Sequence, residues 1–174
     1  MKRFTESVRS SISHKDWYVA LATALTLPDV CGRLINPTLS SSARYTNWFD
    51  TWVAHDYKRK LRGVEHVFLT ASDCYALRCS YLHEGGGDIS QQRARKVLND
   101  FQFTFPPGDG TTIHCNYNDN NGFHTLQLQV DEFCLGIAGA VDKWAESVLG
   151  DVDIQGRMTG LLTIHASASF IKVI

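Results

Sequence analysis

Apolar residues recur every three or four positions over most of the chain, and this spacing predicts a mainly helical protein. The first clear segment starts near Ser13 and runs to Leu25. Pro28 should kink this helix or start a new turn. A second short helix could follow over residues 29–34, until Pro37 breaks the pattern.

Capping residues mark two further helices. The hydroxyl oxygens of Ser40–Ser42 can cap the start of a helix that continues to Val53. Its aromatic residues fall on one face at helical spacing, which favours core packing over base stacking: Tyr45, Trp48, Phe49 and Trp52. Thr70 begins the next helix as part of a capping box with Asp73, and Gly85 supplies its end.

The hydrophobic period changes to two in the second half of the chain. Phe101–Phe105 alternates apolar and polar residues, as a half-buried strand does. Thr112–Tyr117 and Thr125–Val130 are two more strand candidates, joined by residues 118–122, whose Asn-Gly pair suits a hairpin turn. These segments predict a small antiparallel sheet, preceded by a candidate short helix over Gln91–Val97.

Helical spacing returns at Asp131 and continues until Gly150. A last helix is expected over about residues 151–163, followed by an apolar tail, residues 166–174, that docks or frays. The fold class expected is mainly α (α+β), in one domain over residues 1–174. Its parts are a helical segment (1–98), a β element (101–130) and C-terminal helices (131–165).

The composition narrows the class of protein. With 174 residues, 44% hydrophobic and 20% charged, the chain has an ordinary globular composition. Neither a signal-peptide core nor an obvious membrane-spanning run is visible, so we expect a cytoplasmic protein without a membrane partner. The five cysteines form no C-x-x-C pair, and we expect no disulfide framework, no metal site and no cofactor.

Charge is distributed unevenly along the sequence. Residues 1–100 contain 14 Lys/Arg and 10 Asp/Glu, a net charge of +4, whereas residues 101–174 contain 3 and 8, a net charge of −5. The basic half has the sign of a surface that meets phosphate. Its densest part is Lys58–Arg62, expected in a loop, which could contact RNA phosphates or simply be solvated.

Arg78 and His83 combine two chemistries in the helix that Thr70 begins. An arginine fork can bind two phosphate oxygens and offset charge in a transition state. A histidine near the end of a helix can give or take a proton near neutral pH. Together these are the groups that RNA cleavage by the 2′-hydroxyl requires.

The spacing alone does not single out this pair. Arg9 and His14 are also separated by four residues, and Arg59 and His66 by six. The former pair lies near the N-terminus, before the first strongly periodic segment, and the latter crosses Gly63. Only the pair at residues 78 and 83 lies within a capped helix.

Arg78-x4-His83, placed late in a helical scaffold, resembles the signature of the HEPN superfamily. The resemblance implies an antiparallel helical bundle and a metal-independent endoribonuclease that acts as a homodimer, with the two Arg/His pairs facing each other. It also implies a toxin or defence role, with an antitoxin as a candidate partner. The residue after the arginine, commonly polar in catalytic members, is Cys79 here.

The sequence therefore predicts a HEPN-type ribonuclease in which Arg78 binds phosphate and His83 transfers protons. Candidate auxiliary or RNA-binding residues are Asp73, Tyr81, Glu84, Lys58 and Arg59. The alternative is a non-catalytic HEPN-like module that binds RNA, nucleotides or another protein. In that case Arg78 would pair with a buried carboxylate such as Asp50 or Asp73, and His83 would bond to the last carbonyls of its helix.

Overall fold

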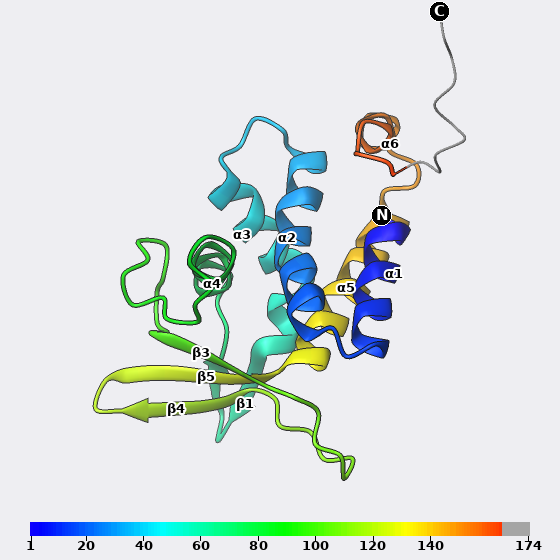
Figure 1. Cartoon of the computed structure of the whole chain (residues 1–174). Coiled ribbons are helices and arrows are strands. Elements are labelled where there is room, and N and C mark those ends of the chain that lie inside the picture. Colours follow the sequence, from blue (N-terminus) through cyan, green and yellow to red (C-terminus); the bar gives the residue numbers. More distant parts are fainter. Residues whose placement is uncertain (165–174) are drawn as a thin grey trace, which may run out of the picture.

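The computed structural model describes residues 1–164, in which helices predominate and strands form two small sheets (Figure 1). The fold is therefore mainly α, of the α+β kind, as the hydrophobic spacing predicts. The helices are α1 (Lys2–Ser13), α2 (Trp17–Ile35), α3 (Ser41–Trp52), η1 (Ala54–Tyr57, a 3-10 helix), α4 (Ala71–Glu84), α5 (Val130–Ser147) and α6 (Val152–Thr159). The strands are β1 (Lys58–Leu61), β2 (Val64–Val67), β3 (Asp100–Thr104), β4 (Asn116–Asn120) and β5 (Phe123–Gln129).

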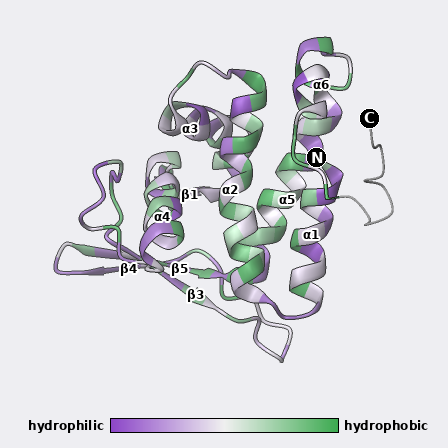
Figure 2. Ribbon diagram, turned by 45° about the horizontal axis from the view of Figure 1, so that its top comes forward, coloured by the Kyte–Doolittle hydropathy of each residue, from purple (hydrophilic) through white to green (hydrophobic). Residues whose placement is uncertain are grey.

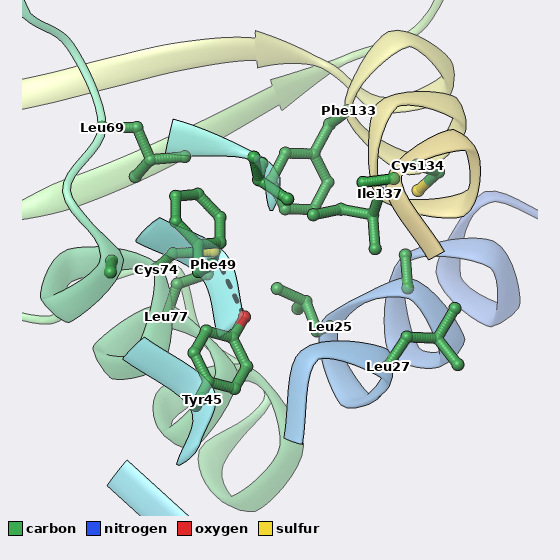
Figure 3. Packing of buried hydrophobic residues seen from close by; sticks show 14 of the residues in the cluster. Leu25, Leu27, Tyr45, Phe49, Leu69, Cys74, Leu77, Phe133, Cys134 and Ile137 are labelled. Carbon is green, nitrogen blue, oxygen red and sulfur yellow. Dashed lines mark hydrogen bonds between the residues drawn. The ribbon is translucent and has the colours of Figure 1, made fainter. Parts of the chain in front are cut away.

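Helix α2 forms the centre of the helical part. It packs against α1, α3 and α5, and its buried positions recur at helical spacing. Leu25 of α2 points toward the aromatic residues of α3, and Leu27 lies on another side of α2 within the same core, to which Phe133 and Ile137 of α5 also belong (Figure 3). Tyr45, Trp48 and Phe49 are buried and Trp52 packs against them partly buried, so the prediction that the aromatic stripe is core is confirmed.

By length and composition, α2 is the one helix among residues 1–164 that could cross a membrane. Half of its most apolar window is buried inside the fold. Figure 2 shows why the helix is so apolar: the hydrophobic positions of α2 and α5 gather in the middle of the molecule, while hydrophilic positions dominate the sheet. The buried positions of α2 in the core account for its apolar composition.

The predicted caps are present. Ser40 accepts a hydrogen bond from the amide of Ala43 and starts α3. Thr70 accepts one from the amide of Asp73 and starts α4, and Gly85, at φ +73°, ends it. A positive φ costs glycine nothing, which is why the helix stops at this residue.

The N-terminal helices differ from the prediction. The structure has a separate helix α1, which ends at Ser13, instead of a first helix that begins there. Lys15, at φ +61°, breaks the chain direction between α1 and α2. Pro28 does not end α2, because burial of Cys31 and Leu34 in the turns beyond it keeps the chain helical.

The three-stranded sheet is mixed rather than antiparallel. Its order is β3-β5-β4, with β5 in the centre. The β4–β5 hairpin is antiparallel and turns at Asn121-Gly122, at φ +53° and +83°, as the Asn-Gly pair predicts. The expected direction of β3 was wrong, since β3 pairs with β5 in parallel. Alternation predicts a strand but not the direction of its partner.

Two further local predictions were wrong. Residues 58–62, expected in a loop, belong to the β1–β2 hairpin, whose Arg62-Gly63 turn also has positive φ at both positions. Residues 91–97, a candidate helix, form turns and irregular structure. The last two helices occur as expected, although α6 ends at Thr159, and the predicted tail at 166–174 lies outside the described residues.

Candidate site on helix α4

Helix α4 carries both residues of the candidate catalytic pair, on different sides. Positions five apart on an α-helix are separated by about 140° around its axis. Arg78 accordingly faces the neighbouring helices and is only 21% exposed, whereas His83 is exposed in the last turn. Within one chain the two side chains are therefore not aimed at a common point.

Arg78 faces a carboxylate of α2. Its Nη2 atom lies 4.0 Å from Oδ2 of Asp29, and its Nη1 atom lies 4.0 Å from the sulfur of Cys79. Both distances are long for hydrogen bonds. The Nε atom of Arg78 is buried without a hydrogen-bond partner among residues 1–164. The guanidinium of Arg78 therefore lies beside Asp29 without a short hydrogen bond to it.

Asp29 has closer partners on α3. Its Oδ1 atom accepts from Nε of Arg44 at 2.8 Å, and its Oδ2 atom accepts from Oγ of Ser41 at 2.8 Å. The side chains of Asp29 and Arg44 are 15% and 13% exposed. Asp29 therefore joins α2, α3 and α4 through one partly buried carboxylate.

The expected partners of Arg78 were wrong. Asp50 is exposed on α3, and Asp73 bonds elsewhere. The carboxylate comes instead from Asp29, which sequence spacing did not indicate because it lies 49 positions away in another helix. The available signal was an aspartate within an otherwise apolar helical segment.

His83 makes no hydrogen bond or ion pair with any other residue of the described part of the chain. The expected bond to the last carbonyls of its helix is absent there as well. One of those carbonyls, that of Tyr81, accepts a hydrogen bond from the amide of Gly85. His83 is accordingly an exposed imidazole at the negative end of a helix dipole.

Asp73, predicted as an auxiliary residue, is a buried structural residue. Its side chain is inaccessible to solvent. Its Oδ1 atom accepts from the amides of Lys96 and Val97 at 2.6 and 3.1 Å, and its Oδ2 atom accepts from the Thr70 hydroxyl at 2.6 Å. It therefore fixes the irregular 91–99 segment on the start of α4 and cannot contact RNA in this arrangement.

Tyr81 and Glu84 are engaged by protein neighbours. The Tyr81 hydroxyl donates to the carbonyl of Tyr18 at 3.2 Å, and this bond ties α4 to the start of α2. Oε1 of Glu84 accepts from Nε2 of Gln92 at 3.1 Å on the surface. Both residues remain near the end of α4 that carries His83.

The basic run lies on the β1–β2 hairpin. Lys58, Arg59, Lys60 and Arg62 are all exposed, and none of them forms an ion pair within residues 1–164. Arg59 folds back, with Nη1 donating to the carbonyls of Asp56 and Lys58. Strands β1 and β2 pair with each other and make few contacts with the other described elements. Lys58, Lys60 and Arg62 are therefore presented to solvent on an isolated two-stranded ribbon.

Three of the cysteines, Cys74, Cys115 and Cys134, are not suited to nucleophilic chemistry. Burial raises the pKa of Cys74 and of Cys134 to about 12, and that of Cys115 to about 11. These thiols stay protonated at neutral pH, and the thiolate is the reactive form. The sulfur of Cys74 lies 3.3 Å from the hydroxyl of Tyr45 inside the core (Figure 3).

We next looked for side chains in the described part of the chain that could bind a metal ion together. No group of three His, Cys, Asp or Glu side chains there could hold a metal ion. Comparisons with family models, with curated proteins and with solved structures found no match for this chain.

Proposed function

We propose that this protein binds RNA in the cytoplasm through the β1–β2 hairpin. The observation that carries the proposal is the set of unpaired cations Lys58, Lys60 and Arg62 on an exposed two-stranded ribbon. Cations without internal partners lose little on binding phosphate and release the counterions of the nucleic acid.

The test is the affinity for a fluorescent single-stranded RNA, measured by anisotropy at low salt. The triple variant K58Q/K60Q/R62Q should bind at least ten times more weakly than the natural chain, because each lost phosphate contact weakens binding. The control is K15Q/R33Q/K143Q, which removes three exposed cations elsewhere. Equal weakening by both variants would mean that net charge, and not the hairpin, governs binding.

RNA cleavage by Arg78 and His83 is the second candidate function. It is favoured by the exposed, unbonded imidazole of His83 and by the poorly satisfied guanidinium of Arg78. Because the two side chains diverge on one helix, a composite site would need a homodimer that brings His83 of one copy to Arg78 of the other. A HEPN-type nuclease with an antitoxin partner would work in this way, and a non-catalytic HEPN-like module would keep only the binding.

Cleavage predicts a clear effect of one substitution. His83→Ala should abolish RNA cleavage in the presence of a chelator and leave the melting temperature unchanged, since His83 is exposed and contributes no bond. His14→Ala, an exposed histidine outside the hairpin and after α1, is the matched control and should retain full activity. Activity that survives H83A, or that H14A removes equally, rules out the catalytic role of His83.

A further inference from the structure

Strand β4 forms an outer edge of the three-stranded sheet. The strand order is β3-β5-β4, so β4 pairs on one side only, with β5 (Figure 1). All five residues of β4 are exposed. An edge of this kind presents a row of backbone N–H and C=O groups that another strand can pair with.

The register of the β4–β5 hairpin shows which backbone groups of β4 point outward. His124 stands opposite Asp119, and its carbonyl accepts from the amide of Asn99, on the side of β5 away from β4. Pairs in an antiparallel ladder alternate between those that exchange backbone hydrogen bonds and those that do not. Asp119 and Tyr117 therefore both direct their N–H and C=O groups away from β5. No other element among residues 1–164 bonds to these groups.

The edges of β3 and β1 are protected in ways that the edge of β4 is not. Residues 87–89 cover the outer side of β3 through backbone hydrogen bonds to Asn99 and Phe101. Strand β1 begins with three cations, Lys58–Lys60, and charge is a usual protection of an edge strand. Strand β4 contains no lysine or proline, and its one carboxylate, that of Asp119, accepts from an amide of the turn.

We infer that β4 pairs with β4 of a second copy of this chain, antiparallel across a two-fold axis at Asn118. In this register Tyr117 of each copy stands opposite Asp119 of the other. The outward groups of both strands then meet, and each such pair exchanges both backbone hydrogen bonds. An edge that is complementary to itself fits a symmetric pair of identical copies.

Charge and backbone geometry select this register over its neighbours. An axis at Asp119 would place the two carboxylates directly opposite each other, and like charges in that position destabilise a sheet. An axis at Tyr117 would require Cys115 to pair with Asp119, but Cys115, at φ +61°, lies outside the strand. An axis at Asn118 avoids both problems and places two neutral amides side by side.

The pairing should be weak and depend on concentration. A five-residue edge buries less surface than the roughly 1,200 Å² of a stable interface. Sedimentation equilibrium of the full chain, up to millimolar concentration, should therefore show a monomer–dimer equilibrium. This dimer does not depend on the proposed RNA binding, and no RNA enters the experiment.

Substitutions at the axis test the register. Asn118→Lys and Asn118→Asp each place like charges opposite each other and should raise the dimer dissociation constant about 2- to 5-fold. An equimolar mixture of the two variants places lysine opposite aspartate, so it should associate more tightly than either variant alone. Gln102→Lys, at an exposed position on β3, makes the same charge change away from the edge and should leave association unchanged.

Hydrogen exchange identifies the surface independently of the variants. Protection of the amides of Tyr117 and Asp119 should increase with protein concentration, whereas the amide of Asn118, which already faces β5, should not change. A chain that is monomeric at all concentrations would overturn the inference. So would a dimer whose association is no stronger in the mixture of N118K and N118D than in either variant alone.

Discussion

A single carboxylate joins three helices at the residue scale. Asp29 of α2 contacts Arg44 and Ser41 of α3 at 2.8 Å, and Arg78 of α4 at 4.0 Å. The two arginines are therefore not equivalent. Arg44 forms a charge-assisted hydrogen bond, and Arg78 stands beside the same carboxylate without forming one.

This difference predicts unequal stability losses. Arg44→Met should lower the free energy of unfolding by about 2–3 kcal/mol, because it leaves a partly buried carboxylate without its close partner. Arg78→Met should cost less than about 1 kcal/mol, because its contact is long. Urea denaturation of both variants measures this, and equal losses would show that Arg78 is as firmly paired as Arg44.

His114 makes stability depend on pH. Its Nδ1 atom accepts from the amide of Gln129 at 3.3 Å, and burial lowers the pKa of the imidazole despite the carboxylates of Glu132 and Asp131 nearby. The unfolded chain therefore binds this proton at a higher pH than the folded chain does. The stabilising contribution is complete above the ordinary pKa, near 6.5, and is lost as the pH falls through the lower folded value.

The prediction is that the free energy of unfolding decreases between pH 7.5 and pH 5 and that His114→Gln flattens this dependence. Denaturant titrations at several pH values test it, with His66→Gln, at an exposed position on β2, as the control. A variant that leaves the pH dependence of stability unchanged would assign the effect to other groups.

At the scale of elements, helix α4 has a capped N-terminus and an aspartate that bonds to the 91–99 segment. Thr70 caps its first turn, and Asp73 holds the amides of Lys96 and Val97. The same helix therefore carries the candidate arginine and histidine and supports the irregular segment that leads to β3. Loss of the Thr70 cap or of the Asp73 hydrogen bonds should therefore lower the free energy of unfolding.

Thr70→Ala should cost about 1 kcal/mol, the usual effect of losing a cap. Asp73→Ala should cost more, about 2–4 kcal/mol, since it removes a fully buried acceptor that bonds two loop amides and the Thr70 hydroxyl. Thermal and urea denaturation of both variants gives the comparison. A larger loss for the Thr70 variant would show that the hydrogen bonds of Asp73 to the loop amides contribute little.

The elements that were predicted from sequence are those with local signals. Ser40, Thr70 and Gly85 fix the ends of α3 and α4 by chemistry within a few residues, and Asn121-Gly122 does the same for the β4–β5 turn. The parallel pairing of β3 depends on a partner more than 20 residues away, so no local pattern could reveal it.

The candidate site was predicted only in part for the same reason. Arg78 and His83 were chosen by their spacing within a capped helix, but the environment of Arg78 depends on Asp29 in a different helix. The β1–β2 hairpin was missed because its run of basic residues masks the alternation of a strand, and its Arg62-Gly63 turn is not a common hairpin pair. HEPN membership remains a prediction that follows from the motif.

At the scale of the whole molecule, the cations of the hairpin are separate from the apolar core. Apolar residues concentrate in α2 and α5, in the middle of the molecule (Figure 2). The exposed cations Lys58, Lys60 and Arg62 lie on the β1–β2 hairpin. This separation lets charges on the hairpin be changed without disturbing the packed helices. The central claim, RNA binding by the hairpin, can thus be tested without loss of the fold.

The most direct test is the salt dependence of RNA binding. The logarithm of the affinity for a single-stranded RNA is measured against the logarithm of the salt concentration for the natural chain and for K58Q/K60Q/R62Q. The account predicts that the slope of the variant is shallower by about 2, since each of three lost phosphate contacts contributes about 0.7. Identical slopes would contradict it, because the hairpin cations would then make no contact with phosphate.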